Sequence, residues 1–258
     1  MNDSIKIAIN KFLNEYKDKD FFLGAILTGS YATNNQNENS DIDLYIISKD
    51  GTPWKERGNK EVDGYLIEYF INPPKEIRKY MKNEKKDYRL STTNILGRGI
   101  ILIDPTGDIK KLQEEAQEIL AGGLEELEEN TYKINCYRVW DNFDELDSKY
   151  KKREDIDLSY YMFIREVTTS YFQNNKVPLI PIHKLEYILL DPEYKKKYGV
   201  VKFVDDEFAN LLIKCLSEKE YDKKYQCAKE IYDYFIYKNN DFNINDFSMR
   251  TELEEELK

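Results

Sequence analysis

The spacing of apolar residues changes about halfway along the 258-residue chain. In the first half, short apolar runs alternate with segments in which apolar residues recur every three or four positions. The recurring pattern predicts an amphipathic helix over residues 3–16. The next apolar run, residues 21–27, is too short for a helix and predicts a buried strand. Strands that alternate with helices in this way indicate an α/β domain.

The rest of the first half continues the alternation. We expect further strands at residues 41–47, 61–71 and 97–104, and helices at 75–89 and 108–120. Asn72 is expected to cap the helix that follows it, with two prolines in the first turn. Together these elements predict a mixed sheet flanked by helices.

The second half has mainly helical spacing. Residues 124–150, 158–172, 208–216 and 221–237 are predicted to form a helical bundle. In the second of these helices, Leu158, Tyr161 and Ile164 are expected on one apolar face. The Ala121-Gly122-Gly123 segment is the predicted hinge. We therefore expect a catalytic domain over residues 1–122 and a helical substrate-binding domain over residues 123–258.

Charge and cysteine content narrow the class of protein. The chain has 39 Lys and Arg and 49 Asp and Glu residues, which gives a net charge of −10. This acidic balance argues against nucleic acid as a partner and suits a small cationic substrate. The three cysteines have no C-x-x-C spacing and indicate reduced thiols in a cytoplasmic protein. No apolar run has the length of a membrane span, so no membrane partner is expected.

Two acidic residues open the strand at 41–47. Asp41 and Asp43 are two positions apart, so in a strand their side chains point to the same face, with Ile42 and Leu44 on the other. Two carboxylates on one face are unfavourable unless a cation lies between them. A hard divalent ion such as Mg²⁺, completed by substrate phosphates and water, is the expected occupant.

The turn before that strand has the features of a phosphate cradle. Gly29 allows the backbone to approach an anion closely, and a helix expected just after Ser30 would offer unpaired N–H groups. On the next strand, Glu68 is an unusual charge among Leu66, Ile67, Tyr69 and Phe70, which favours a role in the same site. Asp63 is the competing candidate.

The G-S pair, followed ten residues later by S-D-I-D-L, resembles the signature of the nucleotidyltransferase superfamily, in which a glycine-serine turn precedes a D-x-D strand. The family's third carboxylate would match Glu68. A nucleotidyltransferase domain followed by helices looks like the antibiotic-modifying branch, which comprises aminoglycoside and lincosamide nucleotidyltransferases. The resemblance implies an α+β fold with a mixed sheet flanked by helices, followed by a C-terminal helical bundle.

The resemblance also implies a reaction. Gly29 and Ser30 would hold the β- and γ-phosphates of a nucleoside triphosphate, and Asp41, Asp43 and Glu68 would hold one or two Mg²⁺ ions. The expected function is transfer of a nucleoside monophosphate, AMP from ATP, to a hydroxyl of a small molecule, with release of pyrophosphate. An aminoglycoside-like antibiotic is the leading acceptor, which would make the protein a resistance enzyme.

Other residues are weaker candidates. Arg98 and Lys184 could contact the triphosphate, or could be ordinary surface residues. Members of the antibiotic branch often add a carboxylate from the helical half as general base. We name Glu145 for that role, with Asp141 and Glu166 as alternatives, although each is also readily explained as structural. His183, the only histidine, has no partner at metal-ligand spacing.

Three other functions stay open from the sequence. The chain could adenylylate a partner protein, as antitoxin-type nucleotidyltransferases do, or it could bind nucleotides without catalysis. RNA-directed transfer is the least favoured because the charge balance is acidic. A homodimer that shares its site is a further open alternative.

Overall fold

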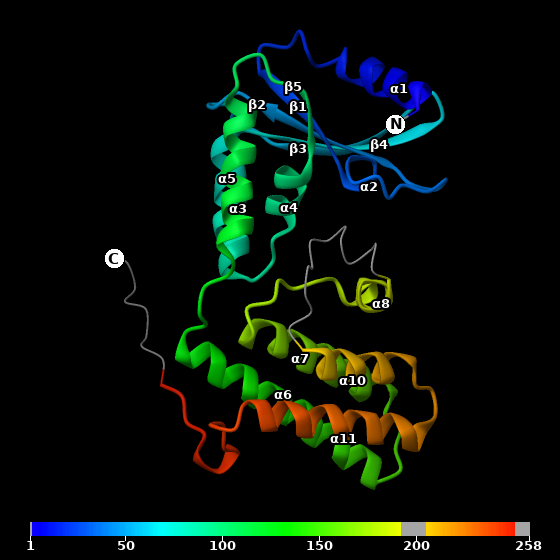
Figure 1. Cartoon of the computed structure of the whole chain (residues 1–258), viewed down its shortest axis with the longest axis vertical. Coiled ribbons are helices and arrows are strands. Elements are labelled where there is room, and N and C mark those ends of the chain that lie inside the picture. The colour runs from blue at the N-terminus through cyan, green and yellow to red at the C-terminus, as the bar shows by residue number, and fades with distance from the viewer. Residues whose placement is uncertain (1, 192–204, 251–258) are drawn as a thin grey trace. The chain divides into compact units, whose positions relative to one another are not determined.

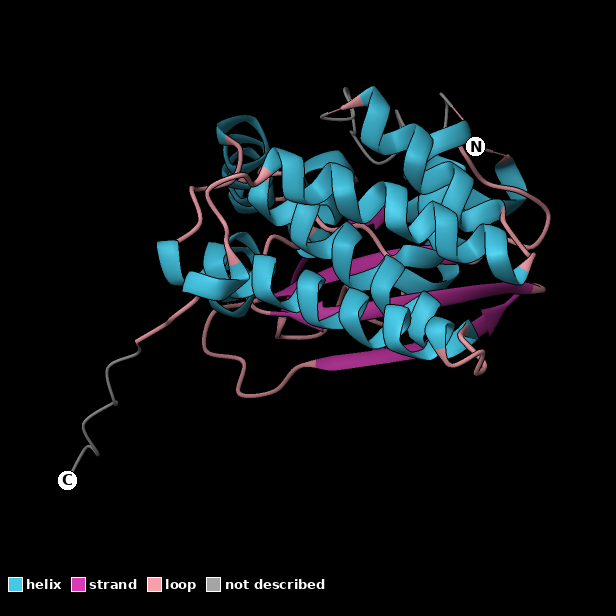
Figure 2. Ribbon diagram, turned by 90° about the horizontal axis from the view of Figure 1, so that it is seen from below, coloured by secondary structure: helices cyan, strands magenta, loops and turns pink. Residues whose placement is uncertain are grey.

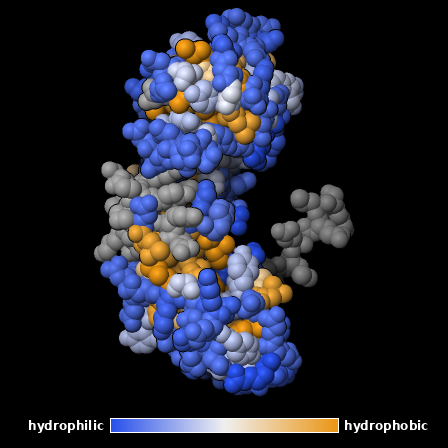
Figure 3. Space-filling view, turned by 90° about the vertical axis from the view of Figure 1, so that its right-hand side faces the viewer, coloured by the Kyte–Doolittle hydropathy of each residue, from blue (hydrophilic) through white to orange (hydrophobic). Residues whose placement is uncertain are grey.

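The computed structural model describes residues 2–191 and 205–250, and the chain divides into two compact units, Met1–Leu124 and Glu125–Lys258 (Figure 1). All strands of the described residues lie in the first unit. Figure 2 draws these strands in magenta and the helices in cyan. Hydrophilic side chains cover much of the face drawn in Figure 3. Among the described helices, none combines the length and the apolar character needed to cross a membrane.

The first unit is built on a five-stranded mixed sheet. Its strands are β1 (Phe22–Thr28), β2 (Ile42–Ser48), β3 (Glu56–Val62), β4 (Tyr65–Asn72) and β5 (Ile100–Ile103), in the spatial order β3-β4-β2-β1-β5. Only β2 and β4 are parallel to one another, and the other three neighbouring pairs are antiparallel. A mixed sheet flanked by helices is the predicted arrangement, so that prediction is confirmed.

The prediction of a single strand over residues 61–71 was wrong. The chain instead forms a hairpin of β3 and β4, and its turn residues Asp63 and Gly64 have φ values of 52° and 81°. A tight two-residue hairpin turn requires positive φ at both central positions, and the Asp-Gly pair favours this turn. The strand β3 was missed because its sequence, ERGNKEV, lies at the edge of the sheet and has no apolar alternation.

Helices cover both faces of the sheet (Figure 1). The helix α1 (Asp3–Leu13) packs on one face, where Leu44 and Ile46 of β2 are buried against it. The helices α3 (Pro74–Lys86), α4 (Ser91–Arg98) and α5 (Asp108–Gly122) pack on the other, where Tyr45 and Ile47 are buried. Alternate residues of β2 therefore belong to two different cores, as the pleat requires.

Two local predictions were wrong around these helices. Asn72 does not cap α3, because it is buried at the end of β4 and its amide donates to the Tyr45 hydroxyl at 2.8 Å. Residues 97 and 98 belong to α4 rather than to a strand. Tertiary contacts define α4: Glu84 of α3 accepts hydrogen bonds from the backbone N–H groups of Thr92 and Thr93 at its start.

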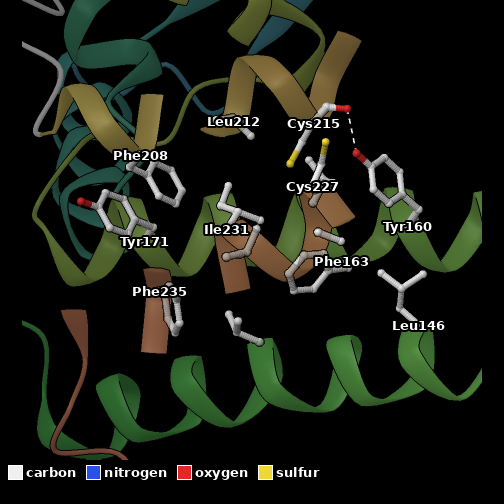
Figure 4. Close-up of a cluster of buried hydrophobic side chains, with 14 of the residues drawn as sticks. Leu146, Tyr160, Phe163, Tyr171, Phe208, Leu212, Cys215, Cys227, Ile231 and Phe235 are labelled. Carbon is white, nitrogen blue, oxygen red and sulfur yellow. Dashed lines mark hydrogen bonds between the residues drawn. The ribbon is translucent and has the colours of Figure 1, made fainter. Parts of the chain in front are cut away.

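The second unit is helical over its described residues. It contains α6 (Glu129–Lys151), α7 (Asp157–Asn174), α8 (Ile182–Leu190), α10 (Asp206–Ser217), α11 (Tyr221–Lys238) and a short 3₁₀ turn (Ile244–Asp246). Its core is rich in aromatic residues, including Phe163, Tyr171, Phe208 and Phe235 (Figure 4). The helical C-terminal region that the sequence predicts is therefore confirmed.

The buried face of α7 includes Ile164, as predicted, but differs from the prediction near the start of the helix. Leu158 and Tyr161 are 71% and 51% exposed, whereas Tyr160 and Phe163 are buried. The Tyr160 hydroxyl donates to the backbone carbonyl of Cys215 in α10 (Figure 4). A buried tyrosine needs such a partner for its polar end, and apolar spacing alone does not reveal it.

The three cysteines, Cys136, Cys215 and Cys227, are free and buried. Burial raises the pKa of the Cys136 and Cys215 thiols to about 12. Both groups are therefore protonated at neutral pH, when a nucleophilic thiol would have to be ionised.

Asp205 joins three helices of the second unit. Its carboxylate caps α10 by accepting the N–H groups of Glu207 and Phe208. It also accepts hydrogen bonds from the hydroxyls of Tyr171 in α7 and Tyr234 in α11. Partial burial alone would raise the pKa of Asp205, but bonds from Tyr234, Lys238 and Tyr171 outweigh burial and hold the pKa well below its usual range.

We predict that Asp205→Asn lowers the free energy of unfolding by about 2 kcal/mol at pH 7, because the cap is kept but the charge is lost. Because the pKa of Asp205 is lower in the folded than in the unfolded protein, its charge stabilises the fold at a pH above the unfolded pKa of about 3.9. This stabilisation disappears as the pH falls towards the folded pKa. Denaturant unfolding from pH 7 to pH 2.5 should therefore show the difference from wild type shrinking below pH 4. A difference that is constant with pH would contradict this role.

Candidate active site

Strand register brings three carboxylates to one end of the sheet. Asp43 of β2 is the register partner of Glu68 in the parallel strand β4 and of Thr28 in the antiparallel strand β1. Neighbouring register partners project to the same face of a sheet, and Asp41 lies two residues before Asp43. One oxygen of each of Asp41, Asp43 and Glu68 lies within 4.8 Å of the others, and all three residues are half-buried.

The donor set of this carboxylate cluster fits a hard cation. At a separation of 4.8 Å, two carboxylates repel by about 3–4 kcal/mol at an effective dielectric constant of about 20. Three ligands that offer only oxygen are typical of Mg²⁺ or Mn²⁺, not of metals that prefer sulfur or imidazole. Among the described residues, no other set of three or more His, Cys, Asp or Glu side chains could hold a metal.

Gly29 packs directly against the cluster. It has a φ of 63°, and a Cβ atom added there would lie 1.8 Å from Oδ2 of Asp43. Glycine is therefore required twice, once for the left-handed backbone and once for the space that the Asp43 carboxylate fills. The Thr28 hydroxyl donates to the Asp43 backbone carbonyl at 3.3 Å and links the turn to β2.

Ser30 lies in the first turn of α2 (Gly29–Ala32). The first N–H groups of a helix have no partner within the helix, so this turn presents donors next to the carboxylates. The helix starts at Gly29 itself and is a single turn, so the contribution of its dipole is small. What Ser30 and Gly29 offer a phosphate is mainly their backbone N–H groups.

Arg57 is a neighbour of the cluster that the sequence did not reveal. Its Nε and Nη2 donate to Oε1 of Glu68 at 3.1 and 2.5 Å. Arg57 in β3 is paired with Phe70 and lies diagonally across from Glu68 in β4. Reading Asp63-Gly64 as a hairpin turn would have brought Arg57 to this place. Asp63 itself occupies the turn, where the Lys11 amine donates to it at 2.8 Å, and is not part of the cluster.

Arg98 lies at the same end of the sheet as the Gly29 turn. Strand β5 begins with Ile100, the register partner of Leu27, so Arg98 is next to the end of β1 and on its side away from β2. It is exposed, and its Nε donates to Oδ1 of Asn94 at 3.0 Å. The Gln113 side chain of α5 holds this segment by donating to the carbonyls of Leu96 and Gly99.

The other predicted site residues belong to the second unit. Glu145 is 62% exposed and forms an ion pair with Lys149 at 3.3 Å, and Asp141 is exposed on the same helix, α6. Glu166 of α7 is half-buried and accepts a hydrogen bond from Ser170. Lys184 is half-buried on α8. The contacts within this unit do not decide their roles, which stay predictions.

Comparison with known proteins identifies the domain that contains the cluster. Residues 9–102 match the family model of the nucleotidyltransferase domain, a range that includes the carboxylates, the Gly29 turn and Arg98. No curated protein matches the chain. A crystal structure of a nucleotidyltransferase-like protein from Exiguobacterium sibiricum is similar, with a TM-score of 0.45 and 11% identity over 91% of this chain and 75% of that one. The family-model match shows that the segment carrying the carboxylate cluster is similar to a nucleotidyltransferase domain, which supports transfer of nucleotidyl groups.

Gly29→Ala tests the packing of the turn against Asp43. We predict a loss of about 1–3 kcal/mol in the free energy of unfolding, from left-handed strain and displacement of Asp43, together with weaker Mn²⁺ binding by calorimetry. Gly107→Ala is the matched control, because Gly107 has a φ of 78° and an added Cβ would meet nothing within 4 Å. That variant should lose about 1 kcal/mol and bind Mn²⁺ like wild type. Equal Mn²⁺ affinity in the two variants would show that Gly29 does not shape the site.

Proposed function

We propose that the protein uses Mg²⁺ to transfer a nucleoside monophosphate, AMP from ATP, to a hydroxyl group of a small molecule. The observation that supports this most strongly is the convergence of Asp41, Asp43 and Glu68 beside the Gly29 turn. The cluster lies within the range that matches the nucleotidyltransferase domain.

In this proposal each part of the site has one task. Asp41, Asp43 and Glu68 hold Mg²⁺, which when bound neutralises charge on the reacting phosphates and lowers the pKa of the acceptor hydroxyl. The backbone N–H groups of Gly29 and Ser30 bind the β- and γ-phosphates. Most of the rate gain then comes from orienting the α-phosphate and neutralising its charge.

Two basic residues complete the triphosphate contacts in the proposal. Arg98 is exposed at the end of the sheet where the Gly29 turn lies, and a guanidinium can bind a phosphate through two parallel hydrogen bonds. Lys184 of the helical unit would neutralise charge on the leaving pyrophosphate as a point charge. Both residues act on the leaving group rather than on the acceptor.

The acceptor is proposed to be a polycation such as an aminoglycoside, bound by the helical unit. The net charge of −10 supports a cationic acceptor, because it raises the rate at which a cation encounters the protein. An enzyme with this acceptor would confer antibiotic resistance from the cytoplasm.

Glu145 is proposed as the general base that takes the proton of the acceptor hydroxyl. Its exposed position allows contact with a ligand, and its ion-pair partner is Lys149, one helical turn further along α6. Asp141, one helical turn earlier, and Glu166 are the alternatives.

A pyrophosphate-release assay tests the reaction. Each nucleoside triphosphate is combined with aminoglycosides, lincosamides and other hydroxylated metabolites, with and without Mg²⁺. We expect ATP with a cationic acceptor to be turned over, and Asp43→Asn to lower the rate by about 10²–10³-fold because the ion loses a ligand.

Asp63→Asn is the matched control, because this acid lies on the same hairpin as Glu68 but pairs with Lys11. It should keep wild-type activity. Full activity of Asp43→Asn would refute the proposed site. Labelling of a protein band in cell extract, without turnover of any small molecule, would support modification of a partner protein instead.

Glu145→Gln tests the general base. We predict that kcat falls by about 10²–10⁴-fold while Mn²⁺ affinity is unchanged, since Glu145 would act on the acceptor and not on the metal. Asp141→Asn, on the same helix, should change kcat by less than a factor of about 3. If Asp141→Asn has the larger effect, the base is assigned to the wrong residue.

A further inference from the structure

Arg57 and Glu68 form an unusual pair at the edge of the carboxylate cluster. Both donors of Arg57 that contact Glu68, Nε and Nη2, converge on the single oxygen Oε1. No hydrogen bond from the described residues reaches the other oxygen, Oε2. The arginine therefore fixes one end of the carboxylate and leaves one oxygen as a ligand.

The guanidinium of Arg57 is itself held in place. Its Cζ lies 4.9 Å from the centroid of the Phe70 ring, and Phe70 is the cross-strand partner of Arg57 in the hairpin. Stacking on an aromatic face restricts the arginine rotamer. The side chain is nevertheless 69% exposed, whereas that of Glu68 is 20% exposed. A constrained surface arginine thus orients a half-buried acid.

We infer that Arg57 is a positioning residue for the metal site: it holds Oε1 of Glu68 so that Oε2 is presented to the divalent ion. The inference rests on the proposed function, because it requires the cluster to bind a metal. Carboxylates that ligate a metal commonly have their other oxygen hydrogen-bonded, and loss of such an outer partner weakens metal affinity by about 10–100-fold.

If Arg57 acted only through its charge, its removal would change the Mn²⁺ affinity in the opposite direction. Removing a positive charge next to a cation site should tighten metal binding. Because the Arg57 side chain is mostly exposed, solvent and salt screen its charge, and the expected electrostatic gain is small. Loss of orientation should therefore dominate, and the sign of the affinity change separates the two roles.

The test is titration calorimetry with Mn²⁺ alone, without nucleotide or acceptor. Arg57→Ala should bind Mn²⁺ about tenfold more weakly than wild type. Arg57→Lys keeps the charge but loses the two convergent donors, so its affinity should lie between the two. In a Glu68→Gln background, Arg57→Ala should have no further effect, because the residue acts through Glu68.

Lys60→Ala is the matched control for loss of a surface ion pair on the same strand. Lys60 of β3 pairs with Glu15 at 2.6 Å and is not one of the residues of the cluster. Thermal midpoints should fall in both Arg57→Ala and Lys60→Ala, but Mn²⁺ affinity should fall only in the former.

The outcomes separate failure of the positioning role from failure of the metal site. Unchanged or tighter Mn²⁺ binding by Arg57→Ala would overturn the positioning role and leave the proposed function intact. Wild-type Mn²⁺ affinity in Arg57→Lys, together with weaker binding by Arg57→Ala, would show that a single cationic donor to Glu68 suffices, and would overturn the role given to the two convergent donors. If wild type binds no Mn²⁺, or Asp43→Asn binds it equally well, the metal site of the proposed function fails together with the inference.

Discussion

Mutual repulsion of three carboxylates within 4.8 Å is the constraint on which the candidate site of the first unit depends. The parallel pairing of β2 and β4 sets Asp43 opposite Glu68, so the sheet fixes the backbone positions from which these two acids project. Gly29 packs against one of them and Arg57 binds another. The fold thus maintains a concentration of negative charge that a divalent ion relieves, and places backbone donors for a phosphate beside it.

The second unit depends on a different kind of interaction. Its aromatic core is stabilised by burial, and Asp205 adds a fully hydrogen-bonded charge that joins α7, α10 and α11. A carboxylate with this many donors is favourable because each donor offsets part of the cost of burying it. Its partners, two tyrosine hydroxyls and the first N–H groups of α10, are those of a structural group.

Much of the first unit could be predicted from its sequence, for identifiable reasons. The strands β1 and β2 are buried apolar runs, and the two-residue spacing of Asp41 and Asp43 fixes their common face. Glu68 could be chosen because a charge among apolar neighbours is unusual. The family-model match over residues 9–102 agrees with the superfamily that these residues indicate.

The errors have a common physical origin in contacts between elements. Strand β3 is polar and depends on pairing with β4, and α4 depends on Glu84 and Gln113 of other helices. Arg57 is near Glu68 only because the chain reverses at Asp63-Gly64. On α7, Tyr160 packs in the core with its hydroxyl bonded to the Cys215 carbonyl of another helix, and Leu158 is exposed. Apolar periodicity along a single segment carries none of this information.

The most direct measurement of the metal site is anomalous diffraction from crystals grown with Mn²⁺ and a non-hydrolysable ATP analogue. The carboxylate cluster predicts an anomalous peak at coordination distance, about 2.0–2.3 Å, from oxygens of Asp41, Asp43 and Glu68, with the triphosphate over the Gly29 turn. A nucleotide bound elsewhere, or a manganese peak that none of these three residues contacts, would contradict it.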